Sequence, residues 1–168
     1  TGRHKPYYWP DTGSLLFAGY SPHADASGGT LTQVDFNPNA ADRNPYMSVK
    51  FAHKVTDTGT YKKADLTKMP DFMWFDVRDA NSGNTASSGT VNLNFRRALS
   101  MVSLTFSGSA SWYKLKDVRL TGCIYSGTFY SGITAGWLDD VNNVADYVLL
   151  DSSGGVTLNG WKSQDLLM

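Results

Sequence analysis

The sequence of 168 residues contains no glutamate, a single cysteine and three histidines. The lone cysteine, Cys123, excludes a framework of intrachain disulfides. His4, His23 and His53 are far apart, and their spacing is not that of residues that share a metal ion. The 15 acidic residues are all aspartate and concentrate in turn-like segments, where aspartate bends and caps the backbone. Without paired acids, a phosphate loop, or an HExxH or GxSxG motif, the sequence predicts no enzyme, no cofactor and no metal site.

A net charge and long apolar runs are also missing. The formal net charge is zero, and no run of lysine or arginine provides the basic footprint that nucleic acids and anionic membranes require. No segment approaches the ~18 continuous apolar residues of a membrane-spanning helix. A hydrophobic content of 41% with 18% charged residues is typical of a globular protein. The length fits one domain over residues 1–168.

What is present is a series of short segments with β-strand character. Residues 46–51 place Met47, Val49 and Phe51 on one face, and residues 71–77 form a strongly apolar run. Residues 14–20 predict a further short strand. Turn-like segments rich in glycine, asparagine and aspartate separate these runs, and no long helical periodicity interrupts them. The pattern predicts an all-β protein, either a sandwich or a barrel.

Residues 90–129 are predicted to be the central pair of strands, joined by a polar turn at residues 108–111. Apolar residues alternate with polar ones in the first strand, but the alternation slips by one residue between Phe95 and Val102. We expect a β-bulge or a bend near residues 97–101. A long, bent hairpin of this kind forms the central wall of a sandwich. The core is then predicted to include Leu16, Phe17, Val49, Phe51, Phe72, Trp74, Val91, Leu93, Phe95, Val102, Leu104, Phe106, Val118 and Leu120.

Trp112 and Tyr113 are the candidate ligand-contact residues, because they follow the predicted turn at the tip of this hairpin. Exposed aromatic rings there could stack on a sugar, and packing at the edge of the turn is the alternative. Residues 79–84 begin like a calcium loop, but a hairpin loop is the better interpretation, because Asn84 and Thr90 stand where an EF-hand requires glycine and glutamate. The aspartates and asparagines of residues 139–143 could also hold calcium, but the polarity of ordinary loops explains them equally well. Cys123 is expected to be a small buried side chain rather than a nucleophile.

Three segments carry a family resemblance. They are YYWPDTGSLLFAGYSP at residues 7–22, FRRALSMVSLTF at residues 95–106, and YKLKDVRLTGCIYSGTF at residues 113–129. In sequence and order they resemble segments of the fimbrillin family of Bacteroidales surface proteins. These are structural motifs and contain no catalytic residue.

The resemblance implies a transthyretin-like antiparallel β-sandwich of about seven strands, forming the amino-terminal domain of a two-domain surface lipoprotein. It further implies export to the outer membrane through an upstream lipid anchor that this chain does not contain. The chain starts without methionine and stops in an apolar run. We therefore expect that a signal peptide and the first strands precede it and that a second domain follows it.

Two functions are compatible with these observations. The first, which the resemblance implies, is a shaft, anchor or tip subunit of fimbriae that serves in adhesion. In the family, an arginine-specific protease removes a leading segment, and the subunit then assembles with other subunits by strand exchange. The alternative is a β-sandwich adhesin module that binds a carbohydrate or a host protein without polymerising.

Overall fold

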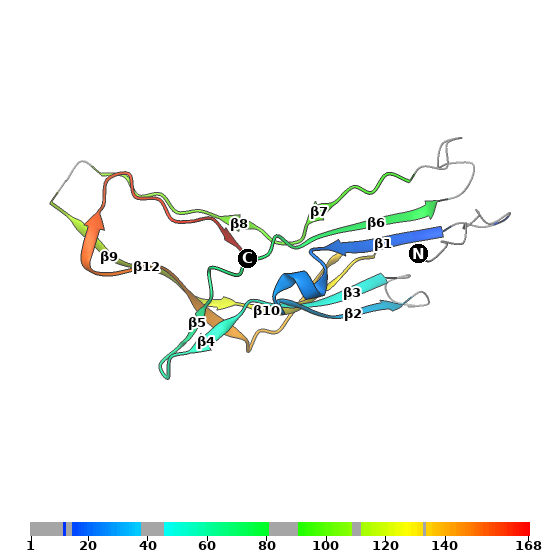
Figure 1. Cartoon of the computed structure of the whole chain (residues 1–168), viewed down its shortest axis with the longest axis horizontal. Helices are drawn as coiled ribbons and strands as arrows, with labels where there is room; N and C mark the ends of the chain where they lie inside the picture. The colour runs from blue at the N-terminus through cyan, green and yellow to red at the C-terminus, as the bar shows by residue number, and fades with distance from the viewer. Residues whose placement is uncertain (1–11, 13–14, 38–45, 81–90, 109–111, 133) are drawn as a thin grey trace, which may run out of the picture.

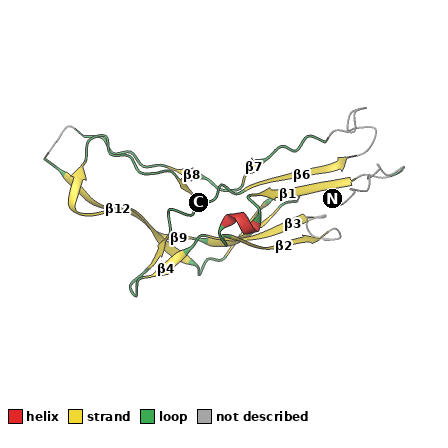
Figure 2. Cartoon of the chain, viewed as in Figure 1, coloured by secondary structure: helices red, strands yellow, loops and turns green. Residues whose placement is uncertain are grey.

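The computed structural model describes residues 12, 15–37, 46–80, 91–108, 112–132 and 134–168. Their regular structure is nearly all β-strand, and the helical part is the short 3-10 turn η1 (Ala24–Ser27) (Figure 2). The predicted all-β class with antiparallel sheets in a sandwich-like arrangement is confirmed. The transthyretin-like topology and the number of strands stay predictions. Within these ranges, no helix has the length and apolar character needed to cross a membrane.

The first sheet has the strand order β1-β6-β7. Its strands are β1 (Leu15–Ser21), β6 (Met73–Ala80) and β7 (Arg96–Arg97). Strand β6 lies in the middle of this sheet, and its aromatic side chains alternate between the two faces. Trp74 points inward and is 7% exposed, whereas Phe75 lies on the outer face.

The second sheet has the order β11-β10-β3-β2. Its strands are β11 (Gly136–Asp139), β10 (Ser126–Tyr130), β3 (Tyr46–Ala52) and β2 (Leu31–Asn37). The prediction for β3 is confirmed, since Met47, Val49 and Phe51 are all buried on the inner face.

The first core lies between these two sheets. Figure 1 shows β1 and β6 as one layer and β2 and β3 as the other. Aromatic rings fill the space: Phe72 packs on Phe51 and Phe129 with ring centroids 6.1 and 5.4 Å apart, and Trp137 contacts all three rings. The buried members are Leu31, Met47, Val49, Phe51, Phe72, Trp74, Leu99 and Phe129.

The second core lies under a third sheet, with the order β4-β5-β12-β9, and a two-stranded ladder of β13 and β8. Ala64, Tyr147 and Leu166 are its buried members. In Figure 1, β9 and β12 extend away from the first two sheets. The strands are β4 (Val55–Asp57), β5 (Lys62–Ala64), β12 (Val144–Thr157), β9 (Lys114–Ile124), β8 (Met101–Val102) and β13 (Leu166–Leu167).

The predicted central hairpin is wrong. Strand β9 pairs with β12, and residues 91–106 contain only the two-residue strands β7 and β8. The slip after Phe95 is not a bulge in one strand. It marks the point where the chain leaves the first sheet, places Leu99 in the first core, and continues to Val102 beside the second.

The core prediction is correct in part. Val49, Phe51, Phe72, Trp74 and Val118 are buried. Leu93 and Phe95 are wrongly predicted, because their side chains are 45% and 47% exposed. The half-buried members are Leu16, Phe17, Val91, Val102, Leu104, Phe106 and Leu120.

His53 joins the two cores. Its ring is 3% exposed and packs edge-to-face on Phe51 of the first core and Tyr147 of the second, at 4.7 and 5.7 Å between centroids. Neither imidazole nitrogen, nor the Tyr147 hydroxyl, has a hydrogen-bond partner of normal geometry among the described residues. Burial lowers the pKa of His53 from 6.5 to about 4, and the smaller, opposite influence comes from the Leu167 backbone.

A pair of phenylalanine truncations tests the assignment of the core. Phe72→Ala should lower the free energy of unfolding by about 3–5 kcal/mol, because Phe72 is fully buried. Phe95→Ala should cost less than about 1.5 kcal/mol, because half of that side chain is in solvent. Urea unfolding of both variants measures the difference. Equal costs would mean that Phe95 is buried, as its sequence pattern suggests.

The buried imidazole should make stability depend on pH. The unfolded chain binds a proton on His53 below about pH 6.5, whereas the folded chain does so only below about pH 4. Protons therefore favour unfolding, and the free energy of unfolding should fall by about 3 kcal/mol as the pH drops through this window. Urea titrations at several pH values measure the loss. His53→Leu should remove most of it, and a variant with an unchanged pH profile would contradict the assignment.

Candidate functional site

Residues 91–95 form an extended run beside the first sheet that is not assigned to a strand. The ladder that comes after it, between β6 and β7, has two residue pairs, Met73 with Arg97 and Trp74 with Arg96. Within the run, Leu93 and Phe95 alternate with polar residues and are about half exposed. This part of the sheet is thus an edge that presents apolar side chains to solvent, which we call the open edge (residues 91–97).

The apolar residues of the open edge point away from the first core. The Arg96 guanidinium lies 5.6 Å from the Trp74 ring on the inner face. Phe95 therefore lies on the outer face, where its ring packs on Phe75 at 5.0 Å. The Phe75 ring covers Gly19 of β1 so closely that an added Cβ there would lie 2.5 Å from it. Phe75 and Phe95 thus form an apolar contact on the outer face of this sheet, beside the open edge.

The next segment, residues 98–100, is fixed by backbone hydrogen bonds on both sides. The Ala98 amide donates to the Phe72 carbonyl at 2.9 Å, and the Trp137 indole Nε1 donates to the Ala98 carbonyl at 2.9 Å. Ser100 and Met168 exchange two backbone hydrogen bonds, at 2.6 and 2.8 Å. The open edge therefore ends against a rigid anchor.

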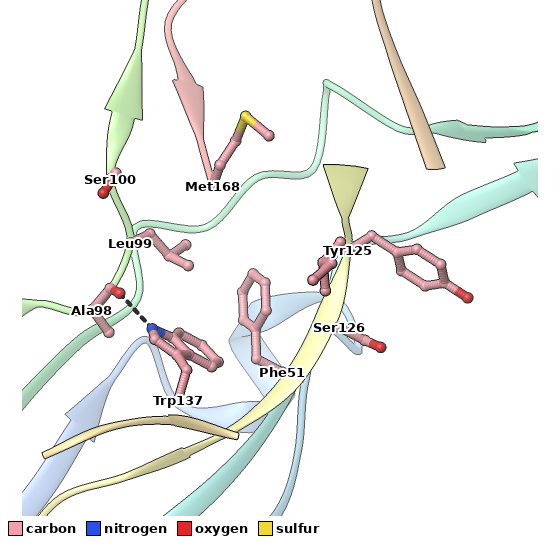
Figure 3. A pocket seen from close by; sticks show the side chains of 9 residues that line it. Phe51, Ala98, Leu99, Ser100, Tyr125, Ser126, Trp137 and Met168 are labelled. Carbon is pink, nitrogen blue, oxygen red and sulfur yellow. Dashed lines mark hydrogen bonds between the residues drawn. The ribbon is translucent and has the colours of Figure 1, made fainter. Parts of the chain in front are cut away.

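A cavity of about 260 Å³ lies beside this anchor, between residues 98–100 and the turn at residues 124–126 (Figure 3). Phe51 and Trp137 of the first core line it on one side, and Met168 lines it on the other. Its lining is mainly apolar and contains no ionisable side chain other than Tyr125. A space of this kind can accept an apolar side chain.

The predicted contact residues Trp112 and Tyr113 immediately precede β9. Their side chains are 77% and 61% exposed, and their rings lie 6.3 Å apart at 46° to each other. Strand β9, which they precede, extends away from β1 and β6 (Figure 1). The two residues are neighbours in the sequence, and their contact with a ligand stays a prediction.

The other candidates have local structural roles. His23 is exposed and lies 3.4 Å from the Asp25 carboxylate, and His4 is outside the described residues, as are residues 81–84 of the first calcium candidate. In the second candidate loop, Asp140 accepts hydrogen bonds from Asn142 and Asn143, so it stabilises its own turn. Within the described ranges, no group of three or more His, Cys, Asp or Glu residues could hold a metal ion.

Cys123 is half-buried in β9. Burial raises the pKa of its thiol, and the nearby Asp146 carboxylate raises it further. Both effects keep the sulfur protonated and unreactive, which agrees with a packing role.

Sequence reasoning missed the open edge because it assigned Leu93 and Phe95 to the core. Strict alternation shows that one face is apolar, but not whether another layer covers that face. The sequence does contain a signal for the open edge. The pair Arg96 and Arg97 interrupts the apolar pattern at the point where the chain leaves the sheet.

Comparison with known proteins gives one match. The sequence model of a family described as fimbrillin-like matches residues 1–159. No curated protein and no solved structure matches the chain.

Replacing Trp137 should weaken the anchor of the open edge. Trp137→Phe keeps an aromatic ring in the first core but removes the indole N–H that the Ala98 carbonyl accepts. We expect the free energy of unfolding to fall by about 1–2 kcal/mol, because a partly buried carbonyl loses its partner. Trp112→Phe, at a residue 77% exposed, is the matched control and should change stability by less than about 0.5 kcal/mol. Equal effects in urea unfolding would contradict this role.

Proposed function

Because the chain belongs to the fimbrillin-like family and is therefore a fimbrial subunit of the cell surface, we propose that it joins its neighbours by exchange of a β-strand. The observation that carries this proposal is the open edge. A strand supplied by a neighbouring subunit would pair with the backbone of residues 91–97 and cover Leu93 and Phe95 at the same time.

The surroundings of the open edge suit such an exchange. Residues 98–100 are held by Phe72, Trp137 and Met168, so the edge is presented by a fixed part of the chain. The cavity of about 260 Å³ at its end would receive one apolar side chain of the incoming strand. A preformed acceptor of this kind loses little conformational entropy on binding.

We further propose that this chain is one part of a longer protein. It would form the amino-terminal domain of a two-domain subunit that reaches the outer membrane through an upstream lipid anchor. A protease specific for arginine would remove a leading segment and make the acceptor available. The subunit could then occupy the shaft, the anchor or the tip of the fimbria.

A second candidate function is adhesion through Trp112 and Tyr113. Their exposure of 77% and 61% favours it, because large aromatic side chains left in solvent are typical of binding surfaces. A host glycan or a host protein would be the ligand. This function needs no polymerisation.

Assembly of the full-length protein tests the main proposal. After brief digestion with a trypsin-like protease, the wild type should form a ladder of SDS-resistant multimers on unboiled gels and filaments in negative-stain micrographs. Phe95→Asp should reduce the ladder about tenfold or more, since a charge on the open edge opposes burial by an incoming strand. Val141→Asp changes an exposed valine, 69% accessible, in the loop between β11 and β12 and should assemble normally.

Two outcomes would count against strand exchange at the open edge. One is a wild type that remains a clipped monomer, which would favour the adhesin function. The other is Phe95→Asp that assembles like the wild type while its urea unfolding shows a folded protein. If Phe95→Asp and Val141→Asp both failed to assemble, the added charge itself, and not its position on the open edge, would be the cause.

A further inference from the structure

A polar hollow of about 370 Å³ lies on the outer face of the second sheet, across β2, β3 and β10. We call it the outer-face hollow and define it by Gln33, Asp35, Tyr46, Ser48, Lys50 and Tyr130. It lies on a different sheet from the open edge and does not include Trp112 or Tyr113. Its ability to hold a ligand therefore does not depend on strand exchange.

A bulge at Gln33 creates this polar face. Thr32 pairs with Lys50 and Val34 with Val49, so Gln33 is an extra residue in β2 and has a left-handed φ of 45°. Without the extra residue, Asp35 would share the inner face with Leu31. With it, Val34 and Phe36 share the face of Val49 and Met47, where they remain 38% and 51% exposed, and Asp35 lies on the opposite face beside Ser48. A non-glycine residue in this conformation is uncommon and occurs preferentially at functional sites.

Strand register then places complementary groups side by side. Asp35, Ser48 and Tyr130 form one row across three strands, and Lys50 lies in the next row beside Thr128. Ser48 is only 9% exposed and forms the floor of the hollow. The Gln33 side-chain amide donates to the Asp35 carboxylate at 3.4 Å, which orients one acceptor.

Aromatic surface completes the lining. The rings of Tyr46 and Tyr130 meet edge-to-face with centroids 5.2 Å apart. In the neighbouring strand β11, Tyr130 pairs with Gly136, which has no side chain to occupy the surface beside it.

This set of groups matches a neutral sugar. Asp35 and Lys50 balance each other in charge, which disfavours both anionic and cationic ligands. Carboxylate, hydroxyl, amide and ammonium groups suit hydroxyls that both donate and accept hydrogen bonds. The tyrosine rings suit the apolar C–H face of a pyranose. We propose that the outer-face hollow binds a neutral saccharide.

The test uses ¹⁵N-labelled protein and five probes: D-galactose, L-fucose, N-acetyl-D-glucosamine, D-mannose and lactose. At concentrations up to about 20 mM, at least one probe should shift the amide signals of β2, β3 and β10 in NMR spectra. Galactose, fucose and lactose represent host-type glycan ends, and mannose represents a microbial mannan. The preferred probe therefore identifies the source of the ligand.

Two exposed residues provide variants that should remain folded. Asp35→Asn and Lys50→Gln should each weaken binding of the preferred probe about tenfold, because each removes a charged hydrogen-bonding group. Val141→Ala, at an exposed loop residue between β11 and β12 that does not line the hollow, is the control and should bind like the wild type. The proposal is overturned if no probe shifts these signals, if the shifts map to Trp112 and Tyr113, or if both hollow variants bind unchanged.

Discussion

Edge-to-face packing of Phe51, His53 and Tyr147 joins the two cores, and the rest of the fold depends on this contact. Phe51 belongs to the first core, Tyr147 is fully buried in the second, and the His53 ring touches both. Because β3 ends at Ala52, the chain passes directly from one core into the other. The imidazole must remain neutral there, since it has no hydrogen-bond partner of normal geometry among the described residues.

Division into two cores explains why the fold leaves an edge open. The chain has to reach from the first sheet to the second core, and residues 96–102 make that crossing with two short strands. Leu99 is buried in the first core and Val102 packs against the second, so residues 91–95 are left outside both. Their alternating apolar side chains then remain available for a partner. A constraint on folding thus produces the surface on which assembly is proposed to depend.

The sequence predicted individual strands better than their partners. Alternation identified the inner face of β3, and the apolar run at residues 71–77 identified β6, because burial on one face leaves a direct pattern. It failed at the predicted central hairpin, because β9 pairs with β12 and not with residues 91–106. It also failed at Leu93 and Phe95, because alternation cannot show whether a second layer covers a face. The polar face of β2 could not be predicted, since it depends on an extra residue, Gln33, that only the register reveals.

Amide hydrogen exchange of the full-length protein, measured by mass spectrometry before and after assembly, tests the role of the open edge most directly. If residues 91–95 are an open edge in the free subunit, their amides should exchange rapidly there and become protected in assembled fimbriae. Amides of β3, which is paired on both sides by β2 and β10, should be protected in both states. Slow exchange of residues 91–95 in the free subunit, or rapid exchange that persists after assembly, would contradict assembly at this edge.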